Sequence, residues 1–287
     1  MSYRTRKYQP AMGLALASGG ARGAYQAGAL LRLAEAGYRY NHIVGTSIGT
    51  LNGAFYVQGD GSVGHMQSLC ERWRSVGEMG VIRPDVANLT KFFLHGVGVP
   101  FGSWILAMTD PEWSVLDTKP IEALLDSWLD YDRICGAPNT LLVGTQKARP
   151  GRRMGEGGVQ YFQAAAVGPR ALRECILASA AIPFVFKARR LPADGQYHQD
   201  AGWVEPIGTR ELYARGVSRM TAIYLDVSEA ESPADYPLVK FHQVRPSKDI
   251  KGFHDGIPST LDFRTERIEA LIHLGYRDAE MSLRSAA

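Results

Sequence analysis

The sequence predicts an α/β fold with a mainly parallel central sheet, and two similar stretches near its start carry this prediction. Each stretch has an apolar run of strand length, then a glycine-containing turn, then residues with helical spacing. The first run covers residues 12–18 and ends at Gly19 and Gly20, and the second covers residues 42–45. Alternating strands and helices form parallel sheets, whose functional loops lie at the carboxyl ends of the strands. We therefore expect both turns on that edge.

The other elements follow in chain order. Apolar residues at helical spacing predict a helix over 24–36, ended by Gly37, and a second helix from the second turn to about residue 57. Residues 58–118 show no clear periodicity, which indicates an insertion with a cap or lid around residues 77–118. Without repeats or a low-complexity linker, residues 1–287 are expected to form one domain. The remaining expected elements are a helix at 118–129, hairpin-like strands at 140–146 and 159–165, a helix at 169–180, a strand at 222–227 and a helix at 260–284.

Charge and cysteine content exclude several classes of protein. The 32 basic and 29 acidic residues give a net charge of +3, too little for a nucleic-acid surface of dominant positive charge. Cys70, Cys135 and Cys175 lack the spacing of a zinc site or a disulfide framework, so we expect no metal and a cytoplasmic location. A basic start followed by AMGLALAS imitates a signal peptide, but cleavage there would run into the first glycine turn.

Ser47 lies between two glycines directly after the second apolar run. The pattern Gly45-Thr46-Ser47-Ile48-Gly49 matches a nucleophile elbow, in which flanking glycines permit a strained turn that raises the serine hydroxyl above the sheet. Small residues follow the turn, as close packing of the helix on the strand requires. The pattern alone leaves open a second interpretation, a glycine-rich loop in which the serine is only a small residue.

The first turn, SGGARG at residues 18–23, precedes a helix and is rich in backbone donors. Its N–H groups, freed by Gly19 and Gly20 and supported by the helix N-terminus, can hold an anion or a developing oxyanion. Binding of a nucleotide phosphate is a weaker hypothesis. The dinucleotide fingerprint requires glycine where Ser18 stands, and the Gly-Lys-Ser/Thr of a P-loop is missing.

A nucleophilic serine needs a base, and the sequence offers histidines and one well-placed aspartate. None of the seven histidines lies in a recognisable base motif. Asp200 follows an expected strand and precedes Ala-Gly. An exposed aspartate has a pKa of about 3.9 and is a poor base at neutral pH, so this role requires burial beside Ser47. The alternative is an ordinary aspartate in a turn.

Several stretches together resemble the patatin-like phospholipases in their order and separation. They are LALASGGARGAYQAGALLRLAEAGY, HIVGTSIGTLNGA, LDTKPIEALL, ILASAAIPFVF and DAGWVEPIG, with a weaker likeness in IEALIHLGYRDAE. The resemblance implies a three-layer α/β/α fold and a Ser-Asp dyad that cleaves acyl esters of glycerolipids. It makes Ser47 the nucleophile and Asp200 the base, without a cofactor. The implied oxyanion loop consists of Gly19, Gly20, Ala21, Arg22 and Gly23.

Two positions depart from the family pattern, and both lie in the implied active site. Ser18 replaces the first loop glycine, and Ala201 stands where Asp-Gly-Gly or Asp-Gly-Ala is usual. Ala201 would be strained if its position required a positive φ. The activity implied by the resemblance is that of a phospholipase A or lysophospholipase. The alternatives are an acyltransferase that uses the same acyl-serine and a non-catalytic lipid-binding relative.

Two further segments suggest contact with lipid. The apolar stretch 92–108 is too short and too interrupted for a membrane span, but it suits an acyl tunnel or a lid that meets the bilayer. A basic loop with Lys147, Arg149, Arg152 and Arg153 suits anionic headgroups. The alternatives are a buried core segment and a solvated loop. The expected partner is thus an acyl-ester lipid, with peripheral membrane contact and no nucleic acid, and the oligomeric state stays open.

Overall fold

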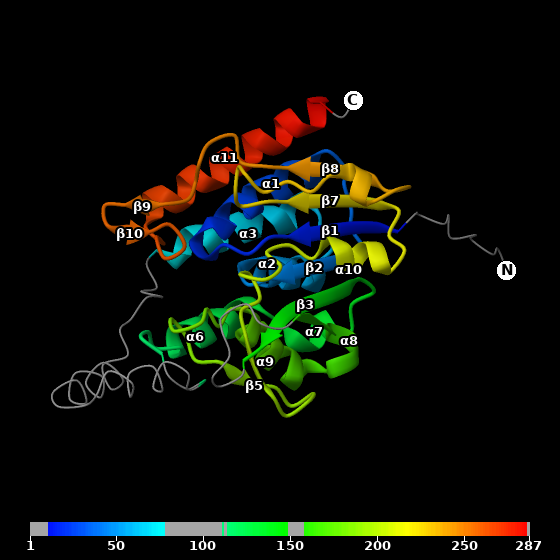
Figure 1. The fold of residues 1–287 in the computed structure, drawn as a ribbon. Coiled ribbons are helices and arrows are strands. Elements are labelled where there is room, and N and C mark those ends of the chain that lie inside the picture. The colour runs from blue at the N-terminus through cyan, green and yellow to red at the C-terminus, as the bar shows by residue number, and fades with distance from the viewer. Residues whose placement is uncertain (1–10, 78–110, 112–113, 149–157, 286–287) are drawn as a thin grey trace.

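A mainly parallel sheet with helices on both faces forms the centre of the computed structural model, which describes residues 11–77, 111, 114–148 and 158–285 (Figure 1). The strand order is β5-β6-β3-β2-β1-β7-β8, and β4 also pairs with β3. Strands β1, β2, β3, β7 and β8 are parallel, whereas β4, β5 and β6 are antiparallel to their neighbours. This arrangement confirms the predicted three-layer α/β/α fold. The strands are β1 Met12–Leu16, β2 His42–Thr46, β3 Thr140–Lys147, β4 Val159–Gln163, β5 Arg189–Arg190, β6 Tyr197–Gln199, β7 Arg219–Ile223, β8 Lys240–Val244, β9 Phe253–His254 and β10 Ile257–Pro258.

The central strands are buried on both faces, which is why they read as nearly continuous apolar runs in the sequence. On one face α1 packs against α3 and the long α11, and α10 lies over the other face (Figure 1). The helices are η1 Gly20–Arg22, α1 Gly23–Glu35, α2 Ile48–Gln58, α3 Val63–Val76, α6 Lys119–Trp128, α7 Tyr131–Cys135, α8 Ala164–Val167, α9 Pro169–Ser179, α10 Thr209–Ala214, η2 Pro233–Asp235 and α11 Thr265–Ser285.

Helix α3 corrects the expectation that residues 58–118 lack regular structure. Ser62 caps this helix, because its hydroxyl oxygen accepts the His65 backbone N–H at 3.3 Å. Buried apolar residues recur at helical spacing along it, so α3 belongs to the core rather than to an insertion. Most of the expected cap at 77–118, the apolar stretch 92–108 and the basic loop from residue 149 to 157 lie outside the described residues.

Two further element boundaries differ from the predicted ones. The strand expected at 222–227 is β7, which begins and ends earlier, at Arg219–Ile223. The helix expected from residue 260 begins only at Thr265, because the β9–β10 hairpin and a turn occupy the preceding residues. The other expected helices and strands agree with the structure to within a few residues.

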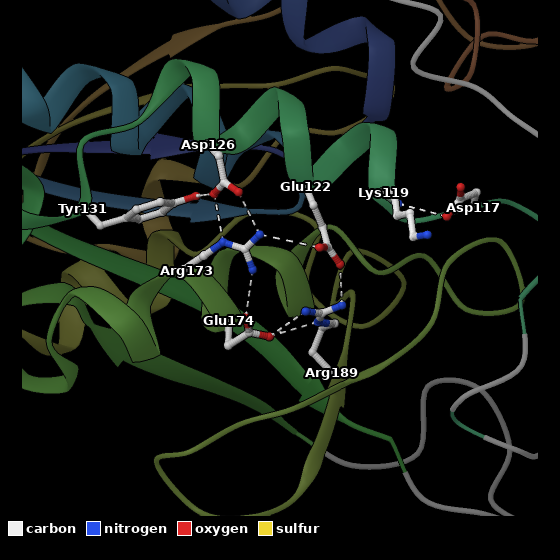
Figure 2. A network of polar contacts seen from close by, with 8 residues as sticks. All are labelled: Asp117, Lys119, Glu122, Asp126, Tyr131, Arg173, Glu174 and Arg189. Atoms are coloured by element: carbon white, nitrogen blue, oxygen red, sulfur yellow. Dashed lines mark hydrogen bonds and ion pairs between the residues drawn. The ribbon is translucent and has the colours of Figure 1, made fainter.

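A network of ion pairs fastens the outer edge strand β5 to helices α6 and α9 (Figure 2). Arg173 of α9 pairs with Asp126 at 2.8 Å and with Glu174 at 3.0 Å. Arg189 of β5 pairs with Glu122 of α6 at 2.7 Å and with Glu174 at 2.8 Å. All five side chains are partly exposed, so each pair stabilises the fold by about 1 kcal/mol or less. Their shared effect is to hold the short strand that leads into β6.

Strands β2 and β6 meet end to end along one edge of β3. The parallel β2 pairs with β3 as far as Gly144, and the antiparallel β6 pairs with β3 at Gln146 and Lys147. Because β4 pairs with β3 over residues 142–146, it must occupy the opposite edge. Strand β6 therefore pairs with the same edge of β3 as β2 does, just beyond the point where β2 ends, and it runs toward that end.

This arrangement brings two distant parts of the chain together. Ser47 directly follows Thr46, the last residue of β2, and Asp200 directly follows Gln199, the last residue of β6. When both registers are extended by one residue, Ser47 and Asp200 reach the level of Thr145 in β3. The sheet itself thus sets how close the two residues come.

Candidate active site

Ser47 occupies a strained turn between β2 and α2. Its φ is 55° and its ψ is −126°, a conformation that non-glycine residues rarely adopt. A Cβ on Gly49 would lie 2.2 Å from the Leu16 carbonyl oxygen, and one on Gly45 would lie 2.5 Å from the backbone of Gly49. Only glycines therefore fit on either side of the serine. This is the backbone geometry that a nucleophile elbow requires.

Ser179, the last residue of α9, holds the elbow by hydrogen bonds. The Ser47 backbone N–H donates to Ser179 Oγ at 2.9 Å, and Ser179 Oγ donates to the Gly144 carbonyl at 2.7 Å. The hydroxyl of Thr50 lies 3.0 Å from the same Oγ. This role of Ser179 was not predicted, and the only signal for it in the sequence is the place of Ser179 in the stretch ILASAAIPFVF. One buried hydroxyl thus joins the turn, β3 and α9.

Asp200 is buried beside Ser47. Its side chain is 3% exposed, and its backbone N–H donates to the Ala181 carbonyl at 2.9 Å. Burial raises the pKa of Asp200 to about 6, although hydrogen bonds from the Ser47 hydroxyl and the Gly202 N–H lower it. The Gly202 N–H lies 2.7 Å from Asp200 Oδ1. The burial that the sequence analysis required of this residue is therefore present.

The glycine turn after β1 leaves two of its backbone amides without a partner among the described residues. Gly20 has a φ of +58°, and a Cβ there would lie 2.1 Å from the Thr260 carbonyl oxygen. The Ala21 N–H donates to that carbonyl at 2.9 Å, and the Arg22 N–H donates to the Gly19 carbonyl at 3.3 Å. The N–H groups of Gly19 and Gly20 have no hydrogen-bond partner within the described part of the chain. Both glycines line the cavity described below.

Arg22 braces the glycine turn from inside the protein. Its Nε donates to the Gly19 carbonyl at 3.1 Å, and its Nη1 donates to the Leu225 carbonyl at 2.8 Å. Burial lowers the pKa of the guanidinium, while nearby carboxylates including Glu229 raise it. The turn is thereby tied to the residues that follow β7, and Gly23 begins α1 directly behind it.

A cavity of about 350 Å³ opens beside these groups. It lies at the carboxyl ends of the parallel strands, where α/β proteins place their sites. The predicted site residues that line it are Ser47, Asp200, Gly19, Gly20 and Arg22. The predicted residues that do not line it, and that instead shape the two turns, are Ala21, Gly23, Gly45, Thr46, Ile48 and Gly49.

Glu229, Lys251 and Thr260 form a wall of the cavity that was not predicted from the sequence. These residues follow β7 and belong to no motif, so only the tertiary structure reveals them. Lys251 forms an ion pair with Asp226, and burial lowers its pKa. Burial raises the pKa of Glu229, and the positive charge of Arg22 partly offsets that effect. The cavity therefore contains both a cationic and an anionic side chain besides Asp200.

The two departures from the family pattern cause no backbone strain. Neither Ser18 nor Ala201 has a positive φ. The Ser18 N–H donates to the Pro206 carbonyl at 2.8 Å, and the Ala201 carbonyl accepts the Val204 N–H at 2.9 Å. Ala201 is fully buried without requiring a left-handed conformation. Both side chains are therefore compatible with an intact site.

Among the residues that the structure describes, no group of three or more His, Cys, Asp or Glu side chains is arranged to hold a metal ion. No described helix combines the length and the apolar character needed to cross a bilayer. The free thiols Cys70 and Cys175 have pKa values raised to about 12 by burial, so both are protonated at neutral pH.

Solved structures with the same fold are known. VipD from Legionella pneumophila is 11% identical with a TM-score of 0.50, over 96% of this chain and 67% of that one. Human GIVD cytosolic phospholipase A2 is 12% identical with a TM-score of 0.53, over 98% of this chain and 64% of that one. The same human protein in complex with methyl gamma-linolenyl fluorophosphonate gives 14% identity and a TM-score of 0.56, over 96% and 59%. The chain thus spans about two thirds or less of the length of these proteins.

Sequence comparison identifies the family more directly than these distant structures. No curated protein sequence matches the chain. The sequence profile described as patatin-like phospholipase matches residues 14–213, which include both glycine turns, Ser47 and Asp200. The match covers well over half of the chain and agrees with the fold. The chain belongs to the patatin-like phospholipase family, and this membership supports the function of a lipid hydrolase.

Proposed function

We propose that this protein is a lipid acyl hydrolase in which Ser47 and Asp200 form a catalytic dyad. Asp200 takes the hydroxyl proton as Ser47 Oγ attacks the ester carbonyl carbon, and the carbonyl oxygen becomes an oxyanion. The oxyanion accepts hydrogen bonds from the N–H groups of Gly19 and Gly20. As the intermediate collapses, Asp200 returns the proton to the leaving alcohol and an acyl-serine remains. Water, deprotonated by Asp200, then releases the fatty acid and restores the serine.

One observation carries this proposal: a buried carboxylate stands beside the hydroxyl of a strained serine, in a cavity lined by two glycines whose amides have no partner among the described residues. With a pKa of about 6, Asp200 is ionised at neutral pH. It is also a stronger base than an exposed carboxylate, whose pKa is about 4. The same burial that costs stability therefore supplies the basicity that the reaction needs.

The alternative of a non-catalytic lipid-binding relative rested on Ser18 and Ala201. The ordinary backbone at both positions supports a working site instead. The amide of Ala21, in contrast, is not assigned to the oxyanion hole, because it already donates to the Thr260 carbonyl. Of the five residues in the oxyanion loop expected from the family, we therefore assign only the N–H groups of Gly19 and Gly20 as donors to the oxyanion.

Labelling with a fluorophosphonate probe tests whether Ser47 is a nucleophile. Such a compound is the inhibitor in a structure of the human phospholipase A2 named above. We expect covalent labelling of the wild type and of Ser127→Ala, a serine on the surface of α6, and no labelling of Ser47→Ala. Absence of label on the wild type would support the non-catalytic relative.

Turnover of p-nitrophenyl acyl esters tests the dyad. We expect Ser47→Ala and Asp200→Asn each to lower kcat by at least about a thousandfold, because neither residue alone can complete the proton transfer and the attack. Both variants should keep the wild-type circular dichroism spectrum. An Asp200→Asn variant with near wild-type turnover would remove this residue from the mechanism.

A further inference from the structure

Large apolar side chains are exposed at the edge of the sheet that holds the candidate active site. Trp203 is 66% exposed and lines the cavity, three residues after Asp200. Phe253 is 73% exposed and begins β9, two residues after the cavity-lining Lys251. Tryptophan is rarely so exposed in a folded protein. One such ring in the cavity wall and a second two residues from that wall therefore call for a functional explanation.

Both rings stand on backbone that is held in place. Next to Trp203, the Val204 N–H donates to the Ala201 carbonyl at 2.9 Å. Phe253 lies in the β9–β10 hairpin, where the Ser259 N–H donates to the Gly252 carbonyl at 2.8 Å. Each ring thus stands beside a hydrogen-bonded turn of the backbone.

A third aromatic ring at this edge is presented by strained backbone. Phe184 is 41% exposed and has a φ of 67°, which is unusual for a bulky residue. It lies two residues after Ile182, which lines the cavity, and its carbonyl accepts the Val115 N–H at 3.0 Å. Strain of this kind persists where the surrounding structure enforces it, often at functional sites.

The charges beside Phe253 are paired with one another. Lys251 pairs with Asp226, and Arg264 pairs with Asp255 at 2.7 Å and with Asp262 at 2.8 Å. A surface that attracted anionic lipid by charge would instead offer unpaired cations. The contribution of this surface to binding is therefore expected to come from the rings.

We propose that Phe184, Trp203 and Phe253, here called the aromatic rim, dock the protein onto the surface of a phospholipid bilayer. The inference rests on the proposed function, because an acyl-ester lipid resides in a bilayer and can enter only a cavity whose mouth faces it. Aromatic rings are the side chains best suited to the boundary between headgroups and acyl chains. Trp203 lines the cavity, and Phe184 and Phe253 each follow a cavity-lining residue by two positions, so docking would bring the ester to the mouth that leads to Ser47.

Sedimentation with vesicles of ether-linked phosphatidylcholine tests the aromatic rim without hydrolysis, because both chains of these lipids are joined by ether bonds and there is no acyl ester to cleave. We expect the wild type to bind, and Trp203→Ser and Phe253→Ser each to lower the partition coefficient by about tenfold. The matched control is Leu238→Ser. Leu238 is 99% exposed but precedes β8, so it lies at the amino ends of the parallel strands, whereas the cavity lies at their carboxyl ends. Its replacement should therefore leave binding unchanged. Raising the salt concentration should have little effect.

Several results would overturn the proposal. They are a wild type that stays in solution, rim variants that bind like the wild type, a Leu238→Ser variant that loses as much binding, or binding that salt abolishes. Turnover of a soluble short-chain ester by the wild type, measured without vesicles, reports on the proposed function separately. A protein that hydrolyses the soluble ester but ignores vesicles would refute only the rim, and one that binds vesicles without turnover would refute only the hydrolase.

Discussion

Replacing Asp200 by asparagine should stabilise the protein although it removes the base. Burial gives this carboxyl a pKa of about 6 in the folded state, against an ordinary value of 3.8. Between about pH 4 and pH 6 the folded protein therefore keeps a proton that the unfolded chain has lost, and the free energy of unfolding falls as pH rises. Above about pH 6 the full loss of unfolding free energy caused by burying the ionised carboxylate is present. It amounts to about 3 kcal/mol.

Two measurements test this reasoning. In urea unfolding at about pH 8, Asp200→Asn should exceed the wild type by up to about 3 kcal/mol, because asparagine avoids the buried charge and can still accept the Gly202 N–H. At about pH 4 the wild-type carboxyl is protonated, and the advantage should disappear. The pH profile of kcat/KM on a soluble ester should rise with pH through an apparent pKa of about 6, since catalysis needs the carboxylate.

The reasoning would be refuted in either of two ways. An activity profile already flat above about pH 5 would show that the base is not the buried, raised carboxyl. An asparagine variant less stable than the wild type at about pH 8 would show that the contacts of the ionised carboxylate outweigh its burial cost.

Three further predictions concern the residues around the dyad. Gly20→Ala should lower kcat by about a hundredfold and stability by more than about 1 kcal/mol, because its Cβ meets the Thr260 carbonyl at a positive φ; ester turnover and urea unfolding measure both, and full turnover would exclude this amide from the oxyanion hole. Ser179→Ala should cost about 1–3 kcal/mol in urea unfolding and lower kcat, because the Ser47 N–H loses its acceptor; unchanged stability would contradict this. Arg189→Met removes two ion pairs and should cost about 2 kcal/mol or less in urea unfolding, and a loss beyond about 3 kcal/mol would mean that the network of Figure 2 acts as one unit.

The parts of the fold that could be predicted are those encoded locally. The two glycine turns were found because strand, turn and helix follow one another within a few residues around Gly19 and Ser47. Helix α3 carried the same kind of signal, with Met66, Leu69 and Trp73 on one face, but it was hidden in a segment judged aperiodic as a whole. A window of one helix length, rather than the whole segment, would have identified it.

The parts that could not be predicted depend on contacts between distant residues. Strand β5 has only two residues, both arginines, and forms because β6 lies beside it. Thr260 reaches the glycine turn through its backbone carbonyl, which leaves no trace in the choice of side chain. Lys251 and Glu229 read as ordinary surface charges until the fold brings them to the cavity.

The end-to-end meeting of β2 and β6 makes the dyad sensitive to the count of residues in a strand. Removing one residue from Tyr197–Gln199 would draw the carboxylate back by about 3.3 Å and turn it to the opposite side of the sheet. Lengthening the loops before β6 would leave that spacing intact. A designer who wished to transplant this pair of residues would therefore copy β2, β3 and β6 with their pairing register, and could choose the connecting segments freely.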